Sequence, residues 1–148
     1  MNKIDKIVNQ DKLALSTLIV FVKSHHSVYQ REMKTIRESG LTVSQFAVLE
    51  ALYTYKELTI NEIIQKNLST SGNMTVVIRN LEKCGLVERK VNFKDKRSAL
   101  ITLTQKGQNK IESILPKHYS NVIEIMNVLT DEEKQLLKQL LKKLSGVK

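Results

Sequence analysis

The strongest constraint on the fold is a change of pattern at Gly85, inside the stretch from Leu68 to Leu103. Before Gly85, apolar residues recur at i, i+3, i+4 and i+7, the spacing of one helix face: Met74, Val77, Ile78 and Leu81. After Gly85, two short runs rich in β-branched residues, LVERKV and ALITL, flank the polar segment NFKDKRS, a pattern typical of a β-hairpin. The sequence therefore predicts a helix from Thr70 to Gly85 that is followed directly by a hairpin.

The opposite face of this predicted helix is polar and lies close to a basic segment. It carries Ser71, Asn73, Thr75, Arg79 and Asn80. From Arg79 to Lys110 there are nine Lys or Arg residues against three Asp or Glu, and the whole chain has a formal net charge of +9. Basic charge around a polar helix face is typical of nucleic-acid binding, although charge alone does not distinguish DNA, RNA and an acidic membrane.

Helical periodicity covers most of the remaining chain, which has only five Gly and one Pro. One long helix is predicted from Asp11 to Glu38, and its apolar stripe is wide enough to favour a partner helix from a second subunit. Further helices are predicted to start after Thr42, Thr59 and Thr130, because Gln or Glu follows each threonine three residues later in a capping box. Thr104 is predicted to cap a helix that reaches about Val128 and is interrupted at Pro116.

Composition narrows the class of protein further. With 148 residues and 41% hydrophobic residues, the chain is long enough for one packed domain. A lone cysteine, Cys84, excludes an internal disulfide and fits a reducing cytoplasm. The sequence lacks the apolar run of a signal peptide or membrane span, so a cytoplasmic protein without a membrane partner is expected. No Gly-rich phosphate loop or nucleophile–base pattern is present, so neither an enzyme nor a catalytic residue is predicted.

Several motifs between Leu41 and Gly107 resemble the MarR family of winged helix-turn-helix transcription regulators. They are LTVSQFAVLEAL, TSGNMTVVIRNLEKCGLVER, the DKRS segment of the hairpin and LTQKG. The resemblance implies a mainly α fold with a small β-hairpin wing, in a single domain over residues 1–148. It further implies dimerisation helices at 11–38 and 105–148 and a DNA-binding lobe at 42–104. Members form homodimers, bind palindromic operators in double-stranded DNA, usually repress, and are often released by small phenolic or lipophilic ligands or by thiol oxidation. No cofactor is implied.

The DNA contacts are expected on the polar helix face and on the hairpin. Base contacts are predicted for Ser71, Asn73, Thr75 and Val76, with Arg79 nearer the backbone, and Thr70 is a further DNA-binding candidate. Capping of the helix start is the alternative role of Ser71 and Asn73. The resemblance implies that Arg97 enters the minor groove, held by Asp95, whereas the alternative is a solvated ion pair. Phosphate contacts or free charges are expected for Lys94 and Lys96, and Arg89 either contacts DNA or braces the hairpin.

The signal that controls DNA binding is less well defined by the sequence. The resemblance implies an effector pocket for a small molecule, with candidate residues Phe21, His25, Tyr29, Phe46 and His118; each is alternatively core or interface. A metal site is not predicted, because neighbouring His25 and His26 point about 100° apart on a helix. For Cys84, packing beside Gly85 is favoured over a redox role, since a helix C-terminus disfavours a thiolate.

The sequence thus predicts a sequence-specific DNA-binding regulator, in particular a repressor released by a small aromatic or lipophilic ligand. Two alternatives stay open: a regulator that responds to thiol oxidation, and a ligand-independent protein that coats DNA with little sequence preference.

Overall fold

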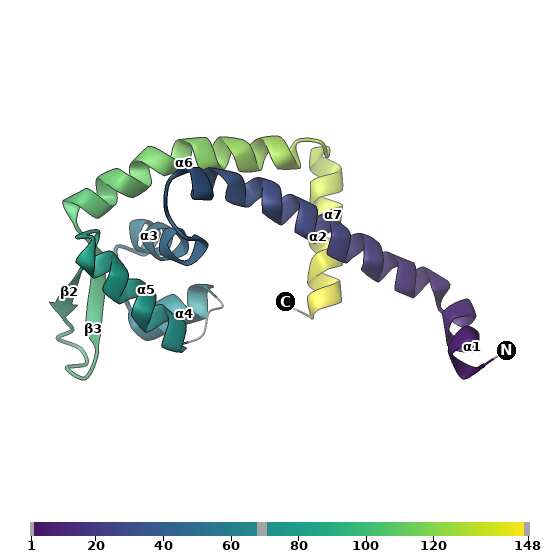
Figure 1. The fold of residues 1–148 in the computed structure, drawn as a ribbon, viewed down its shortest axis with the longest axis horizontal. Helices are drawn as coiled ribbons and strands as arrows, with labels where there is room; N and C mark the ends of the chain where they lie inside the picture. The colour runs from purple at the N-terminus through teal and green to yellow at the C-terminus, as the bar shows by residue number, and fades with distance from the viewer. Residues whose placement is uncertain (1, 68–70, 147–148) are drawn as a thin grey trace. The chain divides into compact units, whose positions relative to one another are not determined.

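The protein is described from a computed structural model that covers residues 2–67 and 71–146. Its fold is mainly helical with one small antiparallel sheet, which confirms the predicted fold class (Figure 1). In chain order the elements are α1 (Lys3–Gln10), α2 (Lys12–Glu38), α3 (Val43–Tyr55), β1 (Glu57–Thr59), α4 (Ile60–Asn67), α5 (Ser71–Lys83), β2 (Val87–Val91), β3 (Ala99–Leu103), α6 (Gln105–Met126) and α7 (Asp131–Ser145).

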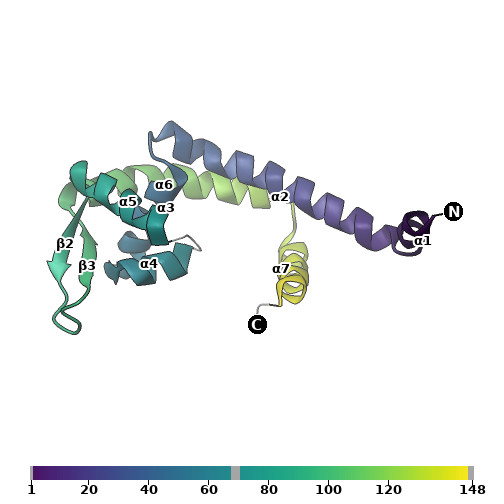
Figure 2. The ribbon, with the colours of Figure 1, turned by 60° about the horizontal axis from the view of Figure 1, so that its bottom comes forward.

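The chain forms two compact units. The first contains the residues up to Lys34 and from Ile125 onward, and the second, called the lobe below, contains Thr35–Glu124. Both boundaries fall inside helices, because α2 and α6 each run on from one unit into the other as one uninterrupted ribbon (Figure 2). The predicted role of these helices in dimerisation stays a prediction.

The core of the lobe forms around the helices that the sequence periodicity predicts. All four residues of the predicted stripe on α5 are buried, with exposed fractions of 8% or less: Met74, Val77, Ile78 and Leu81. On α3, which begins with the predicted capping box, the buried side chains are Phe46, Val48, Leu49, Ala51 and Leu52. The Thr42 amide donates to Oε1 of Gln45 at 3.0 Å, and the Gln45 amide donates to Oγ1 of Thr42 at 3.2 Å.

The sheet has three strands in the order β1-β3-β2, all antiparallel. The hairpin formed by β2 and β3, together with its loop, is the wing and projects beside α5 (Figure 1). The third strand, β1, was not predicted; it pairs Leu58 with Ile101 of β3. Because Leu58 and Ile101 are both buried, β1 fixes the base of the wing to the core.

The end of α5 is joined to the start of α6 by a cluster of hydrogen bonds. Gly85 has φ of +69°, and the Leu86 amide donates to the Leu81 carbonyl at 2.9 Å, as in a Schellman ending. The Thr104 hydroxyl donates to the Gly85 carbonyl at 2.6 Å, and the Thr104 amide donates to the Leu86 carbonyl at 3.1 Å. A Cβ at Gly107 would lie 1.9 Å from the Leu86 carbonyl oxygen, so this approach requires glycine.

Helix α6 runs from Gln105 to Met126 and contains Pro116, so the predicted interruption at this proline is wrong. Pro116 is exposed, which leaves solvent available to the backbone carbonyl that the ring deprives of its partner. Among the described residues, no helix combines the length and apolarity needed to cross a bilayer.

The first unit differs from the lobe in having many exposed apolar side chains. α1, which was not predicted, starts with a capping box between Asn2 and Asp5. α7 starts with the predicted box between Thr130 and Glu133, yet none of its described residues is buried. The large apolar side chains of α2 and α7 that are at least half exposed are Leu13, Leu18, Ile19, Val20, Val22, Leu136, Leu140 and Leu144.

Candidate nucleic-acid interface

The polar face of α5 is exposed, as the sequence predicts. Asn73, Thr75, Arg79 and Asn80 are all exposed, and 42% of the Val76 surface is accessible. Ser71 is the first residue of the helix, whereas Thr70 lies outside the described residues. These five exposed residues of α5 offer amide, hydroxyl, methyl and guanidinium groups, a set that suits contact with base edges and phosphates.

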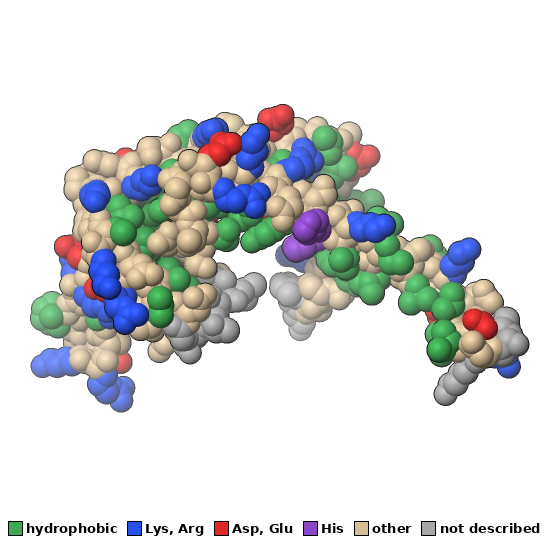
Figure 3. Space-filling view, in the orientation of Figure 1, with side chains coloured by type: hydrophobic (Ala, Val, Ile, Leu, Met, Phe, Trp, Pro, Cys, Tyr) green, Lys and Arg blue, Asp and Glu red, His purple; other side chains and the backbone are tan. Residues whose placement is uncertain are grey.

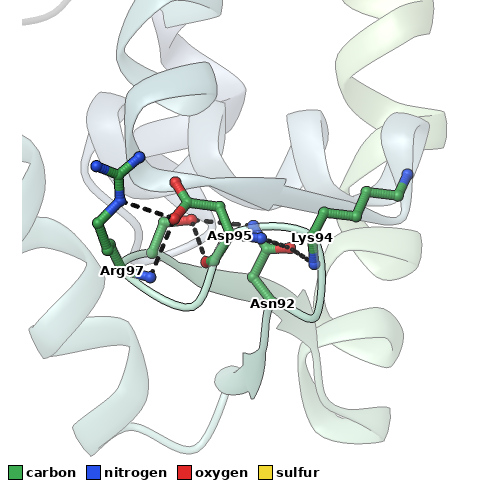
Figure 4. Close-up of polar contacts among 5 residues, drawn as sticks. Asn92, Lys94, Asp95 and Arg97 are labelled. Carbon is green, nitrogen blue, oxygen red and sulfur yellow. Dashed lines mark hydrogen bonds and ion pairs between the residues drawn. The ribbon is translucent and has the colours of Figure 1, made fainter.

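The loop of the wing, Asn92–Ser98, holds Asp95 against Arg97 (Figure 4). One carboxylate oxygen of Asp95, Oδ1, accepts from both the Arg97 amide and the Arg97 Nε, each at 3.1 Å. The Arg97 side chain is nevertheless 92% exposed, so its outer guanidinium nitrogens point into solvent. The predicted pairing is thus present, and it orients an arginine outward rather than covering it.

Asn92 shapes this loop, and sequence reasoning missed it. The residue is only 8% exposed, and its Oδ1 accepts from the amides of Lys94 at 3.0 Å and Asp95 at 3.3 Å. Its Nδ2 donates to the Ser98 hydroxyl at 2.9 Å, which ties the two ends of the loop together (Figure 4). An asparagine that binds the amides two and three residues ahead is a known turn arrangement, so NFKD contained a usable signal.

Cations gather at the end of the wing, as Figure 3 shows for the Lys and Arg side chains. Lys90, Lys94, Lys96 and Arg97 are all exposed, and Asp95 is the single carboxylate of the Asn92–Ser98 loop. Such a concentration of positive charge attracts phosphates and makes binding depend on salt.

Arg89 has a different environment from the other predicted cations. Its Nε donates to Glu82 Oε1 at 2.8 Å and a terminal nitrogen donates to Glu82 Oε2 at 3.1 Å, a two-point ion pair between β2 and α5. Only 39% of its side chain is exposed. The geometry favours the bracing role over the DNA contact, because the guanidinium is already engaged by a carboxylate.

The capping box at Thr59 and Glu62 lies at the base of the wing. Glu62 Oε2 accepts from the Thr59 amide at 2.7 Å and from the Thr59 hydroxyl at 2.9 Å. These two hydrogen bonds, with smaller contributions from the charges of Lys66 and Lys94, lower the pKa of Glu62 below its ordinary value. Glu62 therefore stays ionised at neutral pH.

The five predicted effector residues form two separate pairs and one single residue. In the lobe, the rings of Phe46 and His118 are 4.8 Å apart, and both residues are buried. His118 Nδ1 lies 2.9 Å from the Thr35 hydroxyl. In the first unit, the rings of His25 and Tyr29 stack at 6.0 Å, and Phe21 is 39% exposed. The lobe pair has the environment of core residues, whereas the three residues on α2 have accessible surface.

The structure corrects one prediction and adds one fact about metal binding. The prediction that Cys84 packs beside Gly85 is wrong, because the Cys84 side chain is exposed. Its carbonyl accepts from Lys106 Nζ at 2.7 Å. Within residues 2–67 and 71–146, no three His, Cys, Asp or Glu side chains lie together in a way that could hold a metal ion.

The chain is similar to known transcription regulators in both sequence and fold. The family model described as transcriptional regulator SarA/Rot matches residues 30–114. The HTH-type transcriptional regulator YkoM of Bacillus subtilis is 35% identical over 130 residues, which cover 88% of this chain and 84% of YkoM.

Two solved structures show the same fold. Reduced AbfR bound to DNA is 27% identical with a TM-score of 0.67, and the match covers 94% of this chain and 98% of AbfR. AbsC, a MarR family transcriptional regulator from Streptomyces coelicolor, is 17% identical with a TM-score of 0.74, over 99% of this chain and 95% of AbsC.

The class of protein follows from these matches. The curated relatives are named as transcriptional regulators, so the prediction that the chain is not an enzyme is confirmed. Helix α5 and the wing with its basic loop, whose motifs resemble the MarR family, all lie within the matched residues 30–114. The chain belongs to the MarR-type winged helix-turn-helix transcription regulators, and the SarA/Rot family model matches its central part.

Proposed function

We propose that the protein is a homodimeric repressor that binds a palindromic operator in double-stranded DNA and is released by a small aromatic or lipophilic ligand. The observation that carries this proposal is the wing loop, in which Asp95 and Asn92 hold the 92% exposed Arg97 outward beside the polar face of α5. A helix for the major groove and an arginine for the minor groove together supply sequence selection.

Duplex DNA is the polyanion that best fits this arrangement. Asn73 suits a two-point contact with adenine, and Val76 with Thr75 suits the methyl group of thymine. A narrow A·T-rich minor groove has the strongest negative potential and is the preferred place for Arg97. The similarity to AbfR, which was solved bound to DNA, supports the same kind of partner here.

Dimerisation is supported by the exposed apolar side chains of α2 and α7. A monomer would leave Leu18, Ile19, Leu136 and Leu140 more than half exposed to water. Apolar surface that recurs on several helices is typical of a subunit interface. A two-fold dimer would present two copies of α5 to the two halves of a palindrome.

Ligand release is supported by the aromatic and histidine side chains on α2. Phe21, His25 and Tyr29 combine accessible ring surface with polar groups, as a pocket for an aromatic molecule requires. A ligand weakens operator binding only if it binds the DNA-free conformation better than the DNA-bound one.

The DNA assignment is tested with a duplex selected by the wild-type protein from a random-sequence library. Arg97→Ala should lower affinity for this duplex about tenfold or more. It should also reduce the slope of log affinity against log salt by about 1.8, because the dimer loses two cations that displace counterions, at about 0.9 each. Lys138→Ala, which removes the same charge from α7, is the control. The affinity and its salt dependence are both measured by fluorescence anisotropy.

Three outcomes would each contradict a part of the proposal. Equal affinity of the wild type for the selected and for random duplexes at physiological salt would indicate a DNA-coating protein instead of an operator-binding one. Unchanged affinity of Arg97→Ala for the selected duplex would exclude Arg97 as a DNA contact of the wing. A panel of phenolic and quinone-like compounds that leaves the operator complex intact at saturation would contradict release by an aromatic ligand.

A further inference from the structure

The wing loop carries an exposed aromatic residue that neither the basic charge nor the core explains. Phe93 is 87% exposed, more than any other large apolar side chain that the structure describes. Val91, two residues before it, is 65% exposed. A single exposed apolar residue is common, but an exposed Phe beside an exposed Val on a projecting loop forms an apolar patch that favours a partner.

The wing has two chemically different flanks. One flank is a groove of about 380 Å³ whose lining includes the cations Arg89, Lys90, Lys96 and Arg97 and no carboxylate. The other is a groove of about 690 Å³ that Phe93 and Leu100 line, with Glu57, Glu62 and Lys94. Residues 90–92 line both grooves. Arg97 therefore belongs to the basic flank and Phe93 to the apolar one.

The loop is short and closed by hydrogen bonds, so Phe93 and Arg97 are held within one small segment. The Asn92 amide group bonds to Ser98 across the base of the loop and to the backbone amides of Lys94 and Asp95. Only five residues lie between Asn92 and Ser98, and Phe93 and Arg97 are the first and the last of them. A surface that covers the guanidinium of Arg97 therefore comes close to the Phe93 ring.

We propose that Phe93 is a second DNA contact of the wing, in which the ring packs against deoxyribose and base edges in the minor groove beside Arg97. This inference rests on the proposed DNA-binding function. The partner is DNA because Lys94, next in the chain, lines the same groove and because the loop has three cations against one carboxylate. Glu57 and Glu62 on the same flank disfavour phosphate there, so the ring meets the uncharged part of the nucleic acid.

The two contacts of the wing should respond differently to salt. Arg97 displaces counterions when it meets DNA, so its contribution weakens as salt rises. Phe93 contributes by removing apolar surface from water and displaces no counterion. Phe93→Ala should therefore lower the affinity of the dimer about ten- to hundredfold, which is about three- to tenfold for half-burial of each of its two Phe93 side chains, by the same factor at every salt concentration.

The experiment measures affinity for the selected duplex by fluorescence anisotropy over a salt series, for the wild type, Phe93→Ala, Phe93→Leu and Arg97→Ala. In a plot of log affinity against log salt concentration, Phe93→Ala should give a line parallel to that of the wild type and below it. Phe93→Leu should recover most of the lost affinity because it restores apolar surface. Arg97→Ala should give a shallower line. Thermal unfolding should be unchanged in Phe93→Ala, since the side chain is 87% exposed.

The result that would overturn the inference is wild-type affinity in Phe93→Ala, or a loss that Phe93→Leu does not recover. Either outcome leaves the proposed function intact if Arg97→Ala still weakens binding. Failure of the wild type to prefer the selected duplex over random DNA would instead overturn the proposed function.

Discussion

At the scale of single residues, the hydrogen bonds between Glu62 and Thr59 stabilise both the ionised carboxylate and the start of helix α4. The Glu62 carboxylate accepts two hydrogen bonds from Thr59, where β1 ends and α4 begins, and the Glu62 amide donates back to the Thr59 hydroxyl at 3.3 Å. These hydrogen bonds stabilise the ionised carboxylate in the folded state and are absent in the unfolded state. The pKa of Glu62 is therefore lowered in the folded protein.

Replacing Glu62 by Gln should reveal this preference as a pH-dependent loss of stability. A lowered pKa means that the carboxylate stabilises the fold above its ordinary value of 4.5 and that this contribution is lost as pH falls through the lowered pKa. The difference in free energy of unfolding between the wild type and Glu62→Gln should be largest near neutral pH and should shrink below about pH 4.5. Urea unfolding at several pH values measures it.

The matched control is Glu124→Gln, which removes the same charge from an exposed position of α6. A difference between the wild type and Glu62→Gln that stays constant from pH 7 to well below the ordinary Glu pKa would contradict this explanation.

At this scale, the sequence predicts contacts between near neighbours and misses contacts between distant ones. The capping pairs at Thr42, Thr59 and Thr130 and the Asp95–Arg97 pair join residues two or three positions apart, so their chemistry is visible in the sequence. The bond between Thr35 and His118 joins residues 83 positions apart, and the sequence offers no sign that these two meet.

At the scale of elements, hydrogen bonds join the end of α5 to the start of α6. The carbonyls of Cys84, Gly85 and Leu86 at the end of α5 all accept hydrogen bonds from Lys106 or Thr104 at the start of α6. The contact is close enough that no side chain fits at Gly107. The two helices are thus held at a fixed mutual position by backbone groups and not by side-chain packing alone.

Gly107→Ala should break this connection. The added methyl would lie 1.9 Å from the Leu86 carbonyl oxygen and 3.3 Å from Leu103 Cδ2, so the backbone must move apart. Stability should fall by about 2 kcal/mol, which is within the range for overpacked sites, although alanine favours helices more than glycine does. Thermal and urea unfolding measure the change.

Ser120→Ala, at an exposed position of the same helix, is the control and should leave stability nearly unchanged. A Gly107→Ala protein as stable as the wild type would show that the contact between α6 and Leu86 is looser than the structure indicates.

Elements with a strong internal period are the ones that the sequence predicts well. α5 was predicted from Thr70 to Gly85 and spans Ser71–Lys83, and the long helix α2 begins one residue later than predicted. β1 was missed because three residues are too few to show alternation, and its pairing with β3 is more than forty residues away in the chain. The sequence does not decide between the two roles of Arg89, because its partner Glu82 lies on another element.

At the scale of the whole molecule, α7 exposes a row of leucine side chains. Leu136, Leu140 and Leu144 recur every four residues and are all more than half exposed. If these side chains are covered only in a dimer, the melting temperature depends on protein concentration.

Leu140→Glu should therefore shift the protein from dimer to monomer, because the interface would have to bury an unpaired carboxylate. Sedimentation velocity should show a weaker dimer by at least tenfold in its dissociation constant, or about 1.4 kcal/mol. Gln139→Glu, which adds the same charge at the neighbouring exposed position of α7, is the control and should remain dimeric. Unaltered dimerisation of Leu140→Glu would exclude this face from the interface.

The boundary between the two compact units has a consequence for how such a chain can evolve. It passes between Lys34 and Thr35 inside α2 and between Glu124 and Ile125 inside α6, where other proteins have an exposed linker. A protease finds no loop to cut there, and genetic recombination at either point would leave a severed helix end with unpaired backbone groups. The lobe Thr35–Glu124 is therefore continuous with the first unit through two helices, and a cut at either boundary would leave backbone groups without their helical partners.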